Sequence, residues 1–184
     1  MKILYIHGFG SRFDRSSEKV QALEDLGPVY GVNLHYPDGY ARNKHECIEI
    51  VRAFDIDLVV GTSMGGYMAA QIGTERNLPF VCINPAISPN PMLRKYVGTH
   101  VDYHGREYTM TEDAVESYPP MSIAGDGLIL LDMGDDVIDA HETVAQLERY
   151  YDIVTFHGGS HRFDNIVDSL PIIERFVLSP EVAA

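Results

Sequence analysis

Short apolar runs alternate with segments of helical periodicity along almost the whole chain of 184 residues. The runs are too short for buried helices and are bounded by turn residues, which is typical of buried strands. The segments between them repeat apolar residues every three or four positions, as amphipathic helices do. This alternation predicts a single α/β domain over residues 1–184, with about six strands in a mainly parallel sheet and helices on both faces. The expected strands are 2–8, 29–37, 58–61, 80–84, 128–134 and 152–158, and the expected helices are 16–28, 45–54, 64–75, 141–151 and a last one that begins near Leu170 and Pro171.

Composition excludes several classes of partner. Apolar residues make up 45% of the chain, enough for a folded core, and the formal net charge is −13. So acidic a chain is not expected to bind nucleic acid or anionic lipid. No apolar run has the roughly 20 residues that a spanning helix needs, and the first residues do not read as a cleavable signal. Cys47 and Cys82 both lie in apolar periodic segments, where two buried thiols suit a reducing compartment, so we expect a cytoplasmic protein.

One long stretch, residues 85–121, breaks the alternation. It is rich in proline and tyrosine and shows no clear strand, so we expect a lid or binding insertion within the domain. Tyr96 and Tyr103 are candidates for substrate binding there. Tyr108 and Tyr118 lie in the same stretch and could also line an acyl or aromatic pocket. Packing of the lid on the core is the alternative role for all four tyrosines.

A serine flanked by glycines lies where an expected strand turns into an expected helix. Residues 61–65 read Gly-Thr-Ser-Met-Gly, the G-x-S-x-G pattern of a nucleophile elbow. The turn is so tight that side chains two residues on either side of Ser63 would collide, and Gly61 and Gly65 remove them. Gly66 then lets the helix pack closely on the sheet. A serine hydroxyl needs a neighbouring base to act as a nucleophile, so the motif predicts catalysis only together with such a base.

A candidate base and a candidate carboxylate follow later strands. The order along the chain is serine, acid, histidine, which is the order found in hydrolases with a nucleophile elbow. His161 follows the last expected strand in a glycine-containing loop, from which an imidazole can reach the serine. Four aspartates follow the preceding strand. Asp132 is expected within the strand and Asp139 as the cap of the next helix, which leaves Asp135, with Asp136 as second choice, to orient the imidazole.

Donors for a developing oxyanion are expected at two backbone positions. The loop after the first strand reads His-Gly-Phe-Gly-Ser at residues 7–11, and the N–H of Phe9 is one candidate donor. The N–H of Met64, directly after the serine, is the other. His7 and Gly8 would shape the loop, and Gly8 is also a candidate substrate contact.

Together, the segments HGFGS, GTSMGG, GDDVID and GGSHRF resemble the α/β-hydrolase superfamily, and most closely the small bacterial YqiA-type esterases. The resemblance covers most of the chain and is weakest across residues 86–120. It implies a minimal α/β-hydrolase domain and a serine esterase that acts on a small ester or thioester, with Ser63 as nucleophile, His161 as base and an aspartate from the GDDVID turn. No cofactor is implied.

Other readings remain. His100 and His104 have a spacing that binds metal on a helix, but their segment lacks helical periodicity, so no metal site is expected. A thioesterase or an amide-directed acyl hydrolase would use the same three residues. A non-catalytic binding protein on the same scaffold is the alternative from another class. The natural substrate and the oligomeric state do not follow from the sequence.

Overall fold

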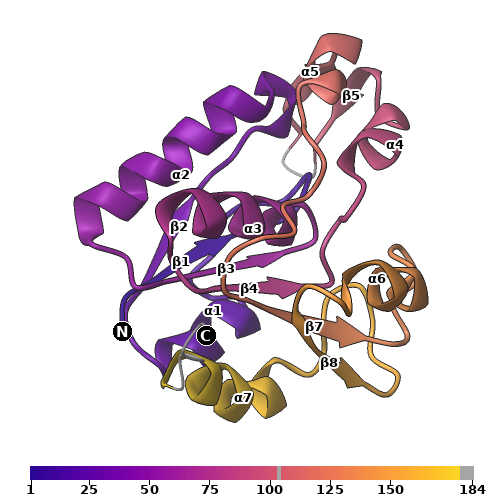
Figure 1. Cartoon of the computed structure of the whole chain (residues 1–184). Helices are drawn as coiled ribbons and strands as arrows, with labels where there is room; N and C mark the ends of the chain where they lie inside the picture. Colours follow the sequence, from indigo (N-terminus) through magenta and orange to yellow (C-terminus); the bar gives the residue numbers. More distant parts are fainter. Residues whose placement is uncertain (103–104, 179–184) are drawn as a thin grey trace.

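The computed structural model describes residues 1–102 and 105–178 as one α/β domain (Figure 1). Six parallel strands form the main sheet in the order β2-β1-β3-β4-β7-β8, which confirms the predicted fold class. The strands are β1 (Ile3–Ile6), β2 (Val29–Val32), β3 (Leu58–Thr62), β4 (Phe80–Ile83), β7 (Gly127–Asp132) and β8 (Asp152–Phe156).

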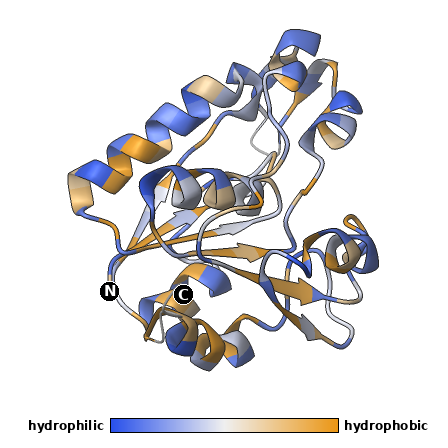
Figure 2. Ribbon diagram, viewed as in Figure 1, coloured by the Kyte–Doolittle hydropathy of each residue, from blue (hydrophilic) through white to orange (hydrophobic). Residues whose placement is uncertain are grey.

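Helices cover both faces of this sheet. The layer with α1 (Glu18–Glu24) and α7 (Ile166–Leu178) packs on one face, and α2 (Tyr40–Phe54), α3 (Met64–Arg76) and α6 (Ala140–Leu147) pack on the other. Successive strand residues point to opposite faces, so each strand contributes to two apolar cores. Within β1, for example, Leu4 belongs to one core and Tyr5 to the other. Figure 2 shows the result: hydrophobic strands in the centre, and helices with one polar side.

The helix starts follow local chemistry. Ser17 caps α1 by accepting a hydrogen bond from the backbone N–H of Val20. Asp139 caps α6 by accepting from the N–H groups of His141 and Glu142, as its capping-box spacing predicts. The predicted start of the last helix was wrong, because α7 begins at Ile166 and holds Pro171 in its interior.

Proline is tolerated there because the carbonyl that loses its partner belongs to an exposed residue. Pro171 has no N–H to donate to the carbonyl four residues earlier, that of Val167. Val167 is 59% exposed, so this turn of the helix faces solvent.

The stretch 85–121 contains more regular structure than its sequence indicates. It folds as α4 (Pro89–Arg94), β5 (Gly98–Val101), β6 (Glu107–Met110) and α5 (Glu112–Glu116), with β5 and β6 paired as an antiparallel hairpin. The expectation of no clear strand was therefore wrong. Both strands of the hairpin are only partly buried, so they lack the continuous apolar run that marks the six central strands.

Candidate active site

Ser63 occupies the sharp turn between β3 and α3 in a strained backbone conformation. Its φ is 58° and its ψ −122°, a region that non-glycine residues rarely adopt. Backbone hydrogen bonds hold the turn: the Ser63 N–H donates to the Ile83 carbonyl at 2.9 Å, and the Ser63 carbonyl accepts from Tyr67 and Ala86 at 3.1 Å each. The strain therefore persists because neighbouring elements fix the serine from both sides.

The glycines around the serine are required by close backbone contacts. A Cβ on Gly61 would lie 2.0 Å from the Gly65 carbonyl oxygen, and a Cβ on Gly65 would lie 2.0 Å from the carbonyl oxygen of Ile6. A Cβ on Gly66 would lie 3.1 Å from the Gly61 carbonyl oxygen, so this glycine is the least constrained of the three. Helix α3 therefore packs at backbone-contact distance against the carboxyl ends of β1 and β3, and its N-terminus lies beside Ser63.

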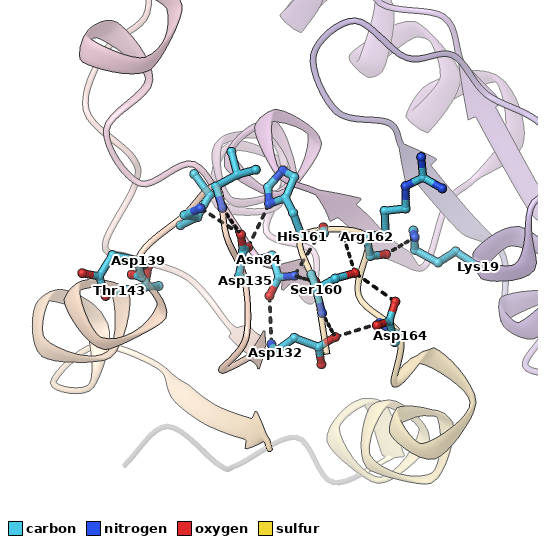
Figure 3. A network of polar contacts seen from close by, with 12 residues as sticks. Lys19, Asn84, Asp132, Asp135, Asp139, Thr143, Ser160, His161, Arg162 and Asp164 are labelled. Atoms are coloured by element: carbon cyan, nitrogen blue, oxygen red, sulfur yellow. Dashed lines mark hydrogen bonds and ion pairs between the residues drawn. The ribbon is translucent and has the colours of Figure 1, made fainter. Parts of the chain in front are cut away.

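His161 lies in the loop between β8 and α7 and is bonded to an aspartate. Its Nδ1 lies 2.8 Å from Asp135 Oδ2, and Asp135 follows β7, the strand beside β8 (Figure 3). The Asp135 side chain is only 1% exposed, whereas that of His161 is 24% exposed. Nδ1 of the imidazole therefore faces a buried carboxylate, and the other ring nitrogen is left for chemistry on the solvent side.

Hydrogen bonds keep the Asp135 carboxylate ionised in this buried position. Its Oδ1 accepts from the backbone N–H groups of Val137 and Ile138 at 2.8 and 2.9 Å. Burial acts to raise the pKa of Asp135, but the hydrogen bonds from His161 and these two amides outweigh it, so the pKa is lowered. Asp136, the second choice from the sequence, is exposed and makes no side-chain hydrogen bond or ion pair within residues 1–102 and 105–178.

A buried polar network, which the sequence analysis did not identify, fixes the loop that carries His161. Asp132 Oδ2 accepts from the backbone N–H groups of Ser160 and Asp164 at 3.1 and 2.7 Å, and Asp132 Oδ1 accepts from Asn165 Nδ2 at 2.6 Å. The Asp132 side chain is fully buried at the end of β7 (Figure 3). A buried carboxylate with three donors is a rigid anchor, so we assign Asp132 a positioning role for the loop.

Asn84 ties the same loop to the neighbouring strand end. Its Nδ2 donates to the Ser160 carbonyl at 3.0 Å, and its Oδ1 accepts from the Asp132 N–H at 3.0 Å. The sequence holds only weak signals for these two residues. Each is a polar residue at the end of an apolar run, and Asn84 is followed by proline whereas Asp132 is followed by Met-Gly. Neither signal points to a partner, because the partners lie 28 to 76 residues away.

The loop after β1 is held by its buried histidine. His7 is 2% exposed; its Nδ1 contacts the Gly8 carbonyl at 2.7 Å, and its Nε2 accepts from the Leu34 N–H at 3.0 Å. This pattern requires the neutral tautomer with the proton on Nδ1. Burial also lowers the pKa of His7, although the bond to Gly8 opposes the shift. The Tyr36 hydroxyl donates to the His7 carbonyl at 2.6 Å, so both the side chain and the backbone of His7 are fixed.

The expected oxyanion donors flank the serine. A Cβ on Gly8 would lie 3.2 Å from Ser63 Cβ and 3.7 Å from Ser63 Oγ, so the loop runs directly over the hydroxyl. Phe9 is the next residue in that loop. Met64 is the first residue of α3, where a backbone N–H has no partner within the helix.

An open cleft of about 590 Å³ joins these groups. Ser63, His161, Gly8 and Phe9 all line it. Among the described residues no hydrogen bond links Ser63 to His161, and catalytic hydrogen bonds are often completed only when substrate is bound. A slightly larger hollow of about 650 Å³ lies around Gly127 and the start of β8, and neither the serine nor the histidine reaches it.

Aromatic rings of residues 85–121 contact the loop after β1. The Phe9 ring lies 4.7 Å from the Tyr96 ring and 6.1 Å from that of Tyr108, measured between centroids. Tyr118 instead packs in the core at 2% exposure and donates its hydroxyl to the Tyr36 carbonyl at 2.7 Å. Tyr103 and His104 lie outside the described residues.

The part of the chain that is described contains no group of three or more metal-ligating side chains that could hold an ion. His100 lies on β5, not on a helix. Cys47 and Cys82 are free and buried, as expected, and burial raises the pKa of both thiols. No helix within residues 1–102 and 105–178 is long and apolar enough to cross a membrane.

Comparison with known proteins places the chain in a family. Residues 2–178 match the family described as "Uncharacterised protein family (UPF0227)". A UPF0227 protein of Shewanella woodyi is 25% identical over 180 residues, which cover 95% of this chain and 98% of that protein. Est1E from Butyrivibrio proteoclasticus superposes with a TM-score of 0.76 at 14% identity, covering 97% of this chain and 87% of Est1E. Mouse alpha/beta hydrolase domain-containing protein 10 gives a TM-score of 0.70 at 13% identity, covering 97% and 89% of the two chains. The chain belongs to the UPF0227 family and has the α/β-hydrolase fold.

Proposed function

We propose that this protein is a serine hydrolase that cleaves a carboxylic ester through an acyl-enzyme, with Ser63, His161 and Asp135 as its catalytic triad. The observation that carries the proposal is the 2.8 Å contact between Asp135 and His161 at a cleft that Ser63 also lines. A carboxylate on Nδ1 holds the proton there, which leaves Nε2 as the base. Solved structures with this fold include esterases and a monoacylglycerol lipase, and they support hydrolysis as the reaction class.

Each step then has a named group. Ser63 Oγ attacks the ester carbonyl while His161 Nε2 takes its proton. The N–H groups of Phe9 and Met64 donate to the oxyanion that forms. His161 returns the proton to the leaving alcohol, and it next activates the water that releases the acid from Ser63. Asp135 stays ionised throughout and stabilises the imidazolium.

The walls of the cleft bear on binding. Gly8 passes over the hydroxyl without a side chain and leaves space for the ester group. Tyr96 and Tyr108 do not line the cleft themselves, but their rings contact that of Phe9, which does, and this contact supports an aromatic or acyl contact on the side of residues 85–121. Tyr103 remains a candidate from sequence only.

Two alternatives use the same scaffold. A thioesterase or amide-directed acyl hydrolase needs the same three residues, so only substrate comparison separates it from an esterase. A non-catalytic binding protein has no need of a buried carboxylate bonded to the histidine, and the Asp135–His161 contact disfavours that alternative.

A fluorophosphonate probe tests the proposal directly. It should label the native protein, and Ser63→Ala should abolish labelling. Ser11→Ala, which removes another hydroxyl from the same cleft, should keep it. Labelling that survives in Ser63→Ala would disprove the assignment of the nucleophile. A panel of p-nitrophenyl esters and matching thioesters, compared by kcat/KM, then separates the ester from the thioester reaction.

A further inference from the structure

Three cationic side chains line the cleft of the candidate site, although the chain as a whole carries a formal net charge of −13. They are Arg12, Lys19 and Arg162. Asp14 is the only carboxylate among the described residues that line this cleft. Its hydrogen bonds from Ser16 lower its pKa, so it is charged, and the cations outnumber it by three to one.

None of the three cations forms an ion pair with a carboxylate within residues 1–102 and 105–178, although Asp14 lies near Arg12, and Glu18 and Asp164 lie near Lys19. Ion pairs within the described residues use seven of the fourteen lysine and arginine side chains, namely Lys2, Arg15, Arg42, Lys44, Arg52, Arg94 and Arg106. Three of the other seven face this one cleft. An acidic protein offers carboxylates over most of its surface, so unpaired cations gathered beside a nucleophile are a feature that needs an explanation.

Contacts hold two of the cations close to the catalytic base. Arg162 directly follows His161 in the chain, and the Lys19 ammonium donates to the Arg162 carbonyl. In the view of Figure 3, Arg162 and Lys19 lie on the side of His161 away from Asp135. Burial lowers the pKa of Lys19, and the nearby carboxylates of Glu18 and Asp164 oppose that shift. A bound anion would act in the same direction as these carboxylates.

We propose that Arg12, Lys19 and Arg162 form a subsite for an anionic group on the substrate, and that this group belongs to the alcohol that leaves. The inference rests on the proposed hydrolase function and adds a substrate class to it: esters whose leaving alcohol carries a carboxylate or phosphate. Arginine and lysine are the side chains that recognise both anions.

The position of the leaving alcohol in the cleft follows from the proposed role of His161 as the base. The imidazole of His161 must face the leaving oxygen in order to protonate it. Groups next to the imidazole on the cleft side are therefore near the alcohol part of the substrate. Arg162 is adjacent in sequence, and Lys19 is bonded to its backbone. The aromatic contacts of Phe9 with Tyr96 and Tyr108 lie on the insertion and suit an uncharged acyl chain.

Three 4-nitrophenyl esters, two acetates and one succinate, test the subsite. They are 4-nitrophenyl acetate, the same acetate with a carboxylate on the nitrophenyl ring, and mono-4-nitrophenyl succinate, which carries its charge on the acyl side. Each kcat/KM is divided by the ester's rate of alkaline hydrolysis. We expect the ester with the anionic leaving group to be preferred about tenfold over the neutral one at low salt, with the preference falling as salt screens the charges.

Single charge removals locate the effect. Arg12→Gln and Arg162→Gln should each lower the ratio of anionic to neutral ester about three- to tenfold, and Arg162→Lys should restore most of it. Arg149→Gln removes the same charge from an exposed, unpaired arginine at the other hollow and should leave the ratio unchanged. The ratio divides out any general loss of activity or folding.

The outcomes separate the two proposals. Hydrolysis of the neutral ester that persists in Ser63→Ala would disprove the proposed function. Hydrolysis that needs Ser63 but shows no preference for the anionic leaving group, or a ratio that Arg149→Gln lowers as much as Arg162→Gln does, would disprove the subsite alone. A preference for the succinate ester would disprove its placement on the alcohol side.

Discussion

Asp135 Oδ2 lies 2.8 Å from His161 Nδ1, while Asp136, its neighbour in the chain, projects into solvent. The difference arises in the turn after β7. The Asp135 N–H donates to the Asp132 carbonyl at 3.1 Å, and Asp135 Oδ1 accepts from two amides further along the turn. The turn thus directs Asp135 toward His161 and leaves Asp136 exposed to solvent.

Asp135→Asn should therefore reduce kcat strongly, and Asp136→Asn should not. The amide cannot hold the imidazole in the required tautomer or stabilise the imidazolium, and the same substitution in the triad of a serine protease lowers kcat on the order of 10⁴-fold. The measurement is steady-state hydrolysis of a p-nitrophenyl ester, with circular dichroism to confirm folding. Full activity in Asp135→Asn together with loss in Asp136→Asn would reverse the assignment.

The buried anchor Asp132 gives a second prediction. In Asp132→Asn an amide nitrogen replaces one of two oxygens that accept from Ser160, Asp164 and Asn165, so a donor faces donors. We expect the free energy of unfolding to fall by about 2–3 kcal/mol. We also expect kcat to fall up to about 100-fold, because displacement of the His161 loop by about 1 Å would misalign the imidazole that we propose as the base.

The matched control for this anchor is Asp164→Asn. Asp164 is exposed, and within residues 1–102 and 105–178 its side chain accepts only from the Ser160 hydroxyl, at 3.0 Å. Its substitution should cost less than about 1 kcal/mol. Chemical denaturation measures both variants, and equal losses would show that the network around Asp132 is not the anchor of the loop.

The main sheet was predictable because its strands are buried on both faces. A strand such as β3 reads as a continuous apolar run. Gly61 and Gly65, at and after its end, indicate a tight turn into a helix. The β5–β6 hairpin was not predictable in the same way. It lies on the surface and pairs Thr99 with Thr109 through their hydroxyls, so its polar residues give no periodic signal.

The candidate site shows the same division. Ser63 and His161 could be identified as candidate site residues from local motifs. The glycines around Ser63 indicate a tight turn, and those before His161 indicate a loop that follows a strand. Asp135 was preferred over Asp136, but the sequence left both candidates, since both follow the strand and only the hydrogen bonds of the turn distinguish them. Asp132 was recognised as a strand residue, but its partners follow β8, and no local pattern encodes a contact across 28 residues.

His7 should make stability depend on pH in a defined window. Burial lowers its folded pKa, so the unfolded chain takes up a proton near pH 6.5 while the folded imidazole stays neutral. The contribution of neutral His7 is then complete above about pH 6.5 and is lost as the pH falls toward the lowered folded pKa.

His7→Asn tests this linkage. The amide nitrogen can still donate to the Gly8 carbonyl, but the Leu34 N–H loses its acceptor, so the free energy of unfolding at pH 7.5 should fall by about 1–3 kcal/mol. Denaturation curves from pH 7.5 to 5 should show a smaller decline for the variant than for the native protein. Parallel declines would show that His7 is not linked to folding.

The backbone strain at Ser63 predicts that this serine is held in its conformation at a cost in stability. Glycine adopts a φ of 58° without the steric penalty that a Cβ brings, and such strained positions cost about 1–3 kcal/mol. Ser63→Gly should therefore unfold with a free energy about 1 kcal/mol higher than Ser63→Ala, after the entropy that glycine adds to the unfolded chain is subtracted. At Arg42, on the exposed side of α2, the order should reverse, with Arg42→Gly about 1 kcal/mol less stable than Arg42→Ala. If the glycine variant is less stable than the alanine variant by the same amount at both positions, the strained conformation at Ser63 does not lower the stability of the fold.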